Sequence, residues 1–350
     1  MDIVTVVGAR PQFIKAAVVS HAFQKAGFQE RIVHTGQHYD PGMSDIFFSE
    51  LGIPSPEINL DVGSGSHGAQ TGAMMIKLEK YLEKRPPDWL VVYGDTNSTL
   101  ASSMVGAKLG IPVAHVEAGL RSFNMRMPEE INRIVTDRLS DLLFCPTQTA
   151  VDHLKTEGMT KGVHLTGDVM LDATKYFAQK AQESRPLHEI LGPEISTFFL
   201  ATVHRAENTN DPNRLSAILD AFRQISETIV WPVHPRTRNL LERFDVSKNV
   251  VIIEPVSYLA MLTLITHSTK VLTDSGGLQK EAVWLGTPCI TMRDETEWTE
   301  TLEGGWNRIV GADTTAIVKA TTLDPHGPAP MFGAVAGGSA SSHICRLLAN

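Results

Sequence analysis

The sequence predicts an α/β fold of doubly wound parallel sheets, and three observations lead to it. Short β-branched apolar runs such as 3–7 and 270–273 recur along the chain, as buried strands of parallel sheets do. Longer segments with helical periodicity, including 13–26 and 96–108, separate them. This alternation starts afresh after about residue 170, and 350 residues suffice for about two domains. We therefore predict two α/β domains of similar build.

The predicted elements follow in chain order. In the first domain, residues 1–170, we expect strands at 3–7, 30–33, 90–93, 111–114 and 141–144. Residues 175–193, rich in Gln, Glu and Ala, are expected to form a polar helix and linker. In the second domain, residues 171–338, we expect a helix at 213–227 and strands at 198–203, 229–233, 250–253, 270–273 and 289–291.

Composition excludes several classes of function. With 31 basic and 39 acidic residues the net charge is -8, which disfavours binding to duplex DNA or to an anionic membrane surface. Three well-separated cysteines, Cys145, Cys289 and Cys345, do not make a disulfide framework, and a reducing cytoplasm fits them best. No apolar run approaches the roughly 20 residues that span a bilayer. We expect a soluble cytoplasmic protein.

Polar side chains follow most of the predicted strands. Ligands of open parallel sheets bind beyond the carboxyl ends of the strands, so these residues form one candidate site. The acids Asp95, Glu117 and Glu129 suit proton transfer, although Asp95 equally fits a helix cap before the Thr-Asn-Ser-Thr segment. His204 and His234 each follow a strand close to an arginine, which suits stabilisation of an oxyanion or a phosphate.

A second feature predicts an anion site. Ser275, Gly276 and Gly277 lie between a strand and a helix, where free backbone N–H groups favour a phosphate. Ser275 fits a simple helix cap equally well, and Glu281 fits either a contact to a ribose or a capping acid. The cations that would face such a diphosphate from the first domain are Arg10 and Lys15. Polar strand ends in both domains indicate a cleft between them.

A metal site is not predicted. No HExxH spacing occurs, and the candidate acids and histidines follow different predicted strands. The glycines of 275–277 are not the GxGxxG or GxxxxGK[ST] fingerprint. We expect no metal and no cofactor.

As an ordered set, the strand-end motifs are far more specific than any one of them. They are Gly8-Ala9-Arg10-Pro11-Gln12 with Lys15, 35–38, 94–99, 115–121, Pro128-Glu129-Glu130 with Asn132-Arg133, His204-Arg205, and 273–277 with Glu281. The chain resembles the non-hydrolysing UDP-N-acetylglucosamine 2-epimerase family over essentially its whole length. The resemblance implies a GT-B fold of two Rossmann-like domains with a UDP-sugar between them, a homodimer, and a C-terminal helix, 339–350, that returns to the first domain.

The resemblance also implies an isomerase mechanism and assigns residues to it. UDP is eliminated as the C2 proton is removed, a 2-acetamidoglucal stays bound, and UDP adds back after reprotonation from the other face, converting UDP-GlcNAc to UDP-ManNAc for cell-surface polysaccharides. The matching catalytic residues are Asp95, Glu117, Glu129 and His204, and the assignment of acids to the two faces of C2 stays open. The matching UDP and sugar contacts are Arg10, Lys15, Arg133, His234, Ser275, Gly276, Gly277 and Glu281.

Departures from the family pattern bear on the substrate. Ala9 and Gln12 replace the usual Thr and Glu, and residues 124–128 and 293–298 also differ. These variations resemble the branch that acts on UDP-2,3-diacetamido-2,3-dideoxyglucuronic acid, an O-antigen precursor, for which Arg126 would pair with the uronate. Arg126 fits a surface residue as well.

The resemblance also bears on regulation and on competing activities. Gln37 and His38 match a pair that binds an activating second UDP-GlcNAc in some members, but the later arginine of that site has no clear counterpart. Three competing hypotheses are a hydrolysing 2-epimerase, a GT-B glycosyltransferase and a non-catalytic UDP-sugar sensor. The intact acids argue against the sensor.

Overall fold

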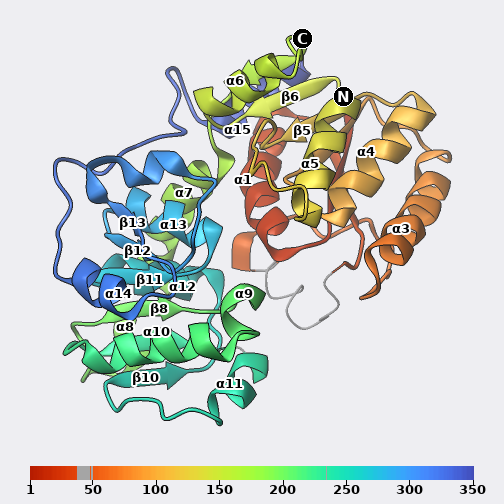
Figure 1. The fold of residues 1–350 in the computed structure, drawn as a ribbon. Helices are drawn as coiled ribbons and strands as arrows, with labels where there is room; N and C mark the ends of the chain where they lie inside the picture. Colours follow the sequence, from red (N-terminus) through yellow and green to blue (C-terminus); the bar gives the residue numbers. More distant parts are fainter. Residues whose placement is uncertain (38–47, 49, 234) are drawn as a thin grey trace. The chain divides into compact units, whose positions relative to one another are not determined.

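The protein is described by a computed structural model covering residues 1–37, 48, 50–233 and 235–350. It divides into two compact units: unit 1 comprises residues 1–173 with 333–350, and unit 2 comprises 174–332. Each unit is built on a parallel sheet whose strands are connected by helices (Figure 1). Within the described residues, we find no helix whose length and hydropathy would let it cross a membrane.

Unit 1 contains a seven-stranded sheet in the order β3-β2-β1-β4-β5-β6-β7. Its strands are β1 (Asp2–Val7), β2 (Gln29–His34), β3 (Ile58–Asn59), β4 (Trp89–Tyr93), β5 (Val113–Val116), β6 (Leu142–Cys145) and β7 (Val163–Leu165). Its helices are α1 (Arg10–Ala26), α3 (His67–Leu82), α4 (Asn97–Leu109), α5 (Pro128–Leu139), α6 (Gln148–Thr156) and α15 (Ala340–Leu348). Val4, Leu78 and Val105 share one buried cluster, so β1 packs against α3 and α4.

Unit 2 contains a six-stranded sheet in the order β10-β9-β8-β11-β12-β13. Its strands are β8 (Phe199–Thr202), β9 (Ile229–Pro232), β10 (Val250–Ile253), β11 (Lys270–Thr273), β12 (Cys289–Thr291) and β13 (Asn307–Ile309). The helices are α8 (Leu187–Leu191), α9 (Ala206–Thr209), α10 (Pro212–Gln224), α11 (Pro235–Leu241), α12 (Tyr258–His267), α13 (Gly276–Trp284), α14 (Thr314–Thr321) and a 3-10 segment (Thr299–Gly305). α7 (Val169–Ser184) begins in unit 1 and ends in unit 2.

Every strand predicted from the sequence is present, with shifted ends in places. The strand expected at 111–114 is β5, Val113–Val116, because the Ile111 N–H bonds to the Gly106 carbonyl and belongs to the end of α4. The expected polar helix and linker is α7 followed by α8. The C-terminal helix α15 packs on α1. The short strands β3, β7 and β13 were not predicted, since two or three residues carry too little periodicity.

The strand order of each sheet locates its binding edge. In unit 1, β2 and β3 lie on one side of β1, and β4 to β7 lie on its other side. The direction in which strands are added therefore reverses between β1 and β4, and we call this point the unit 1 reversal. In unit 2, β9 and β10 lie on one side of β8, and β11 to β13 lie on the other, so the unit 2 reversal falls between β8 and β11. Loops that follow such neighbouring strands diverge, which makes the carboxyl ends at each reversal the expected ligand site.

Candidate functional site

The loop that joins β1 to α1 passes through a narrow gap at the unit 1 reversal. A Cβ atom on Gly8 would collide with the hydroxyls of Thr35 and Ser98, so only glycine allows this path. The two hydroxyls bond to each other at 2.8 Å. Gln37 also joins this cluster, because its Oε1 accepts hydrogen bonds from the Ser98 N–H at 3.0 Å and hydroxyl at 2.6 Å. His38, its predicted regulatory partner, lies outside the described residues.

Gln12 orders the same loop from inside α1. Its Oε1 accepts hydrogen bonds from the N–H groups of Gly8 at 2.8 Å and Ala9 at 3.1 Å, and its Nε2 donates to the Tyr93 carbonyl at 2.9 Å. The loop amides are thus used within the protein rather than offered to a phosphate. An ionised glutamate, the usual family residue at this position, could not make the bond to Tyr93 because it has no proton to donate.

Asp95 is joined to a buried arginine. The Arg133 guanidinium reaches Asp95 Oδ2 through two nitrogens, with Nε at 3.2 Å, and reaches Glu130 Oε2 at 2.7 Å. The cap of α4 is Thr96, whose hydroxyl accepts a hydrogen bond from the Thr99 N–H at 3.3 Å. The alternative interpretation of Asp95 as a helix cap is therefore wrong.

Glu117 is joined to Lys15 by a buried ion pair. Both groups lie against Gly94, where a Cβ atom would come within 3.3 Å of Lys15 Nζ and 3.5 Å of Glu117 Oε2. Glu117 adopts a φ of 71°, in the left-handed region that side-chain-bearing residues rarely occupy. A strained backbone of this kind persists only where the surrounding structure holds it in place, and such residues cluster at functional sites. The structure thus brings together a predicted UDP contact and a predicted catalytic acid.

The start of α5 separates two neighbouring acids. Glu130 is buried and accepts hydrogen bonds from the N–H groups of Ser122 at 2.9 Å and Phe123 at 2.8 Å. Burial alone would raise the Glu130 pKa, but these bonds and Arg133 hold it below the ordinary value. Glu129 is exposed and accessible to a ligand.

Arg126 precedes α5 and is exposed. Its guanidinium has no ion-pair partner among residues 1–37, 48, 50–233 and 235–350. Arg10, the first residue of α1, is half-buried.

In unit 2 a buried aspartate holds the predicted catalytic histidine. Asp274 accepts hydrogen bonds from the backbone N–H groups of His204 and Arg205 at about 3.0 Å, and its Oδ1 lies 3.1 Å from His204 Nδ1. Burial by itself raises the Asp274 pKa, but the bonds from His204, Arg205 and Asn208 lower it below its usual range. The His204 ring is 56% exposed and therefore reachable by a ligand. His234 lies outside the described residues.

The two glycines at the start of α13 differ. The Ser275 hydroxyl caps the helix by accepting the Leu278 N–H at 3.4 Å, as its capping interpretation predicted. A Cβ atom on Gly276 would lie 2.5 Å from Glu297 Oε1, the end of a flexible side chain that would have to move. A Cβ atom on Gly277 would meet no atom within 4 Å. Glu281 lies on the same helix and is buried.

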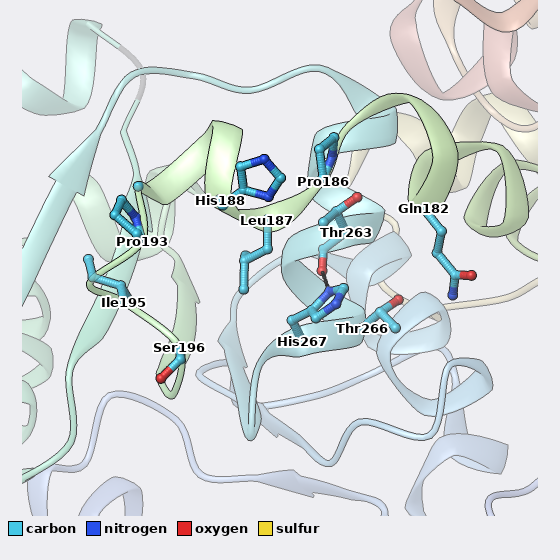
Figure 2. Close-up of a pocket in the computed structure, with 11 residues that line it drawn as sticks. Gln182, Pro186, Leu187, His188, Pro193, Ile195, Ser196, Thr263, Thr266 and His267 are labelled. Atoms are coloured by element: carbon cyan, nitrogen blue, oxygen red, sulfur yellow. Dashed lines mark hydrogen bonds between the residues drawn. The ribbon is translucent and has the colours of Figure 1, made fainter.

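Two cavities of unit 2 differ in their position on the sheet. The one in Figure 2 has a volume of about 550 Å³ and is lined by residues of α7, α8 and α12, among them His188 and His267. It lies at the amino ends of the strands, since Ser196 precedes β8 and His267 precedes β11, so it is not the candidate site. A second cavity of about 340 Å³ is lined by His204 and by Asn210, Asn239 and Arg243.

Sequence reasoning assigned no structural role to three residues that hold the loops of these sites: Gln12, Asp274, and Asp137, whose Oδ2 accepts a hydrogen bond from the Gly119 N–H at 3.2 Å. Gln12 and Asp274 stood inside recognised motifs, next to residues that were chosen. Asp137 is four residues after Arg133 on α5, a spacing that places both on one helix face and that could have drawn attention to it. Among the described residues, no group of three or more His, Cys, Asp or Glu side chains could hold a metal ion.

A family model for UDP-N-acetylglucosamine 2-epimerase matches residues 21–348. The chain belongs to this family. In an alignment 362 positions long, the chain is 50% identical to the UDP-2,3-diacetamido-2,3-dideoxy-D-glucuronate 2-epimerase of Pseudomonas aeruginosa. The alignment covers 100% of this chain and 99% of the relative. The predicted family and the predicted class of enzyme, an isomerase, are thereby confirmed.

Solved structures confirm the fold class. The Methanocaldococcus jannaschii UDP-GlcNAc 2-epimerase, solved in complex with UDP-GlcNAc and UDP, aligns with the epimerase at a TM-score of 0.90 and 41% identity, covering 100% of this chain and 99% of that one. The spinosyn rhamnosyltransferase SpnG aligns at a TM-score of 0.56 and 14% identity, covering 92% and 91%, and therefore shares the fold alone. The predicted GT-B fold class, with two Rossmann-like parallel sheets, is correct.

Proposed function

We propose that this epimerase interconverts UDP-GlcNAc and UDP-ManNAc without hydrolysis, by eliminating UDP and adding it back. The observation that carries the proposal is the pair of acids at the unit 1 reversal, each joined to a buried cation: Asp95 to Arg133, and Glu117 to Lys15. A carboxylate is the form of an acid that accepts a proton. Two separate carboxylates suit a reaction that handles one proton on two faces of the same carbon.

The proposal assigns UDP to the start of α13. The first N–H groups of an α-helix have no acceptor within the helix, and together with the helix dipole they favour an anion. Gly277 leaves open space at this point, so a phosphate can approach the backbone. Glu281 is assigned to the ribose, and Arg10, Lys15 and His234 to the remaining charge of UDP.

The acids are assigned to the sugar ring. Hydrogen on C2 is weakly acidic, so a carboxylate removes it efficiently only as the C1–O bond breaks and C1 gains positive character. The proton passes to one carboxyl group, and UDP leaves with the electron pair of the C1–O bond. On return, a proton reaches the other face of C2 and the UDP oxygen bonds to C1 again. Asp95, Glu117 and Glu129 are proposed for these proton transfers.

His204 is proposed to stabilise the departing diphosphate. The Nδ1–H group of His204 donates a hydrogen bond to Asp274. This bond selects the tautomer with the proton on Nδ1 and leaves Nε2 for a ligand. The exposure of the ring supports contact with a ligand rather than a purely structural role.

A second candidate substrate is UDP-2,3-diacetamido-2,3-dideoxyglucuronic acid. Two observations favour it: the 50% identity over the whole chain to an epimerase named for that sugar, and the exposed guanidinium of Arg126. A carboxylate on the sugar would pair with this guanidinium. If so, Arg126→Gln should lower kcat/KM for the acidic sugar several-fold and leave kcat/KM for UDP-GlcNAc unchanged. Equal losses for both sugars would exclude this role of Arg126.

The decisive experiment is incubation with each UDP-sugar in heavy water, followed by NMR. We expect the manno epimer with deuterium at C2. An epimer without deuterium at C2 would exclude the elimination mechanism, and free sugar with UDP would indicate a hydrolysing enzyme. Transfer of the sugar only when an acceptor is added would indicate a glycosyltransferase.

Asp95→Asn tests the assignment of the acids. Loss of its charge should lower turnover about 100-fold or more, as removal of a proton-transfer group does, with little change in UDP affinity. The matched control is Asp152→Asn on the exposed face of α6, which should be fully active. Full activity of Asp95→Asn would remove Asp95 from the catalytic set.

We also propose a homodimer that works in the cytoplasm. The three cysteines are buried and free, which is compatible with a reducing compartment. Light scattering of the purified chain tests the dimer, since a monomeric mass would contradict it.

A further inference from the structure

The turn that carries Asp95 is held by three side chains from three elements. The carbonyl oxygens of Tyr93, Gly94 and Asp95 follow one another along the chain, and each accepts a hydrogen bond. The donors are Gln12 Nε2 of α1 at 2.9 Å, His115 Nε2 of β5 at 2.7 Å and Asn132 Nδ2 of α5 at 2.9 Å. Preorganisation of this kind fixes the position of a reacting group before the substrate arrives.

His115 differs from the other two donors because both ends of its ring are engaged. Nε2 lies 2.7 Å from the Gly94 carbonyl, and Nδ1 lies 2.7 Å from Asp137 Oδ1. A carbonyl and a carboxylate accept hydrogen bonds and cannot donate them. A neutral imidazole has a single N–H and could satisfy one of these contacts. The ring is completely buried, so water cannot satisfy the other.

The carboxylate beside the ring is held as a hydrogen-bond acceptor. Asp137 is also fully buried, and its Oδ2 accepts hydrogen bonds from the Gly119 N–H at 3.2 Å and from Arg121 Nη1 at 2.7 Å, as an ionised carboxylate does. Arg121 in turn pairs with Glu157 at 2.6 Å. Asp137 thus lies between the His115 ring and Arg121, while Glu157 pairs with Arg121 and, at 3.8 Å, with the exposed Arg138.

Three further titratable groups near the ring add no net charge. Burial raises the pKa of the Cys145 thiol to about 12, so it stays neutral. On the other side of Gly94, Lys15 and Glu117 neutralise each other.

We propose that His115 is a positioning residue: held as an imidazolium, it anchors the turn of Asp95 and the loop of Glu117 to one carboxylate, that of Asp137. One end of the ring holds the Gly94 carbonyl, directly before Asp95. The carboxylate at its other end holds the Gly119 N–H, two residues after Glu117. The two acids thereby keep a constant separation around the reacting carbon. This inference rests on the proposed epimerisation, although the charge of the ring does not.

The charge of the ring is measured directly on the full-length protein, labelled with 15N in histidine. At neutral pH we expect His115 to show a proton on each of the two ring nitrogens, with the resonance assigned by its absence in His115→Gln. Asp137→Asn should remove one of these protons. A single ring proton in the wild-type protein would overturn the proposal, whatever the substrate.

Kinetics measured per folded molecule test the positioning. His115→Phe keeps a ring without donors, and should lower kcat about 10- to 100-fold with UDP affinity retained, because a displacement of about 1 Å costs that much. In Asp137→Asn, the fall of kcat at alkaline pH should begin at lower pH than in the wild type. The control is His164→Gln on β7, outside this network, which should keep the wild-type profile.

The outcomes separate the two hypotheses. Unchanged kcat in His115→Phe, or an unchanged alkaline limb in Asp137→Asn, would reduce His115 to a structural role and contradict the inference. If His115→Phe does not fold, the pH profile of Asp137→Asn decides. If the wild-type protein epimerises no UDP-sugar, the proposed function fails and the positioning role fails with it, whereas two ring protons would still establish the imidazolium.

Discussion

The two units share one architecture, but the residues at the binding edges of their sheets differ in chemistry. At the unit 1 reversal, between β1 and β4, the structure places carboxylates that are paired with buried cations. At the unit 2 reversal, between β8 and β11, it places one buried aspartate, an exposed histidine and a helix start with two glycines. We therefore propose that the same strand order serves proton transfer in one unit and anion binding in the other, because the residues that follow the strands decide the chemistry.

Glycines show the same contrast at closer range. Gly8 in unit 1 is required by the neighbouring hydroxyls of Thr35 and Ser98, and the loop amides around it are bonded to Gln12. Gly277 in unit 2 borders open space. Gly8 is thus a packing requirement of unit 1, whereas Gly277 leaves the space in which we propose a ligand.

The largest expected effect concerns the unit 1 acids. Glu117→Gln removes a carboxylate assigned to proton transfer, and we expect kcat to fall about 100- to 10,000-fold while UDP affinity, assigned mainly to unit 2, changes little. Turnover and UDP titration by calorimetry measure the two quantities. Glu57→Gln, an exposed acid of unit 1, is the control and should be active. Parallel losses of turnover and UDP affinity would break the division of roles between the units.

The next effect concerns the buried acid of unit 2. In Asp274→Asn the amide oxygen can still accept the N–H groups of His204 and Arg205, but an NH₂ group replaces the oxygen that faces His204 Nδ1 and the negative charge is lost, which should cost about 1–3 kcal/mol of stability at neutral pH. The Asp274 pKa is lowered in the folded state, so its contribution is full above the ordinary aspartate range and is lost as pH falls through the lowered value. The difference in unfolding temperature between wild type and variant should therefore shrink in acid.

Asp220→Asn, on the exposed face of α10, is the control for this series and should follow the wild-type curve. A difference between wild type and Asp274→Asn that stays constant with pH would show that the charge of Asp274 adds nothing to stability.

The smallest effect separates the two glycines of α13. Gly276→Ala should lower stability by about 1 kcal/mol, because its Cβ would displace the Glu297 carboxylate that pairs with Arg293 at 2.9 Å. Gly277→Ala should leave stability nearly unchanged and weaken UDP binding, since its Cβ enters the space assigned to the phosphate. Thermal unfolding and UDP titration of both variants measure this contrast. Tight UDP binding in Gly277→Ala would place the diphosphate elsewhere.

Sequence reasoning located the predicted strands, with shifted ends in places, because a buried strand is a local pattern of apolar residues. It could not decide whether Asp95 is a cap or a member of the site, since both need an acid before a helix. The structure decided this through Thr96, which caps α4, and through Arg133, which reaches Asp95 from α5. Neither contact has a signature in the segment that contains Asp95.

What the sequence determined by itself is the alternation of strands and helices, the family, and the identity of the polar residues at the strand ends. These follow from periodicity and from motifs that are contiguous in the chain. Only the tertiary structure decided the pairing of Glu117 with Lys15, the support of Gly94 by His115, and the difference between Gly276 and Gly277. The physical reason is that each of these depends on atoms from elements far apart in sequence, whose distances are set by the packing of the sheet.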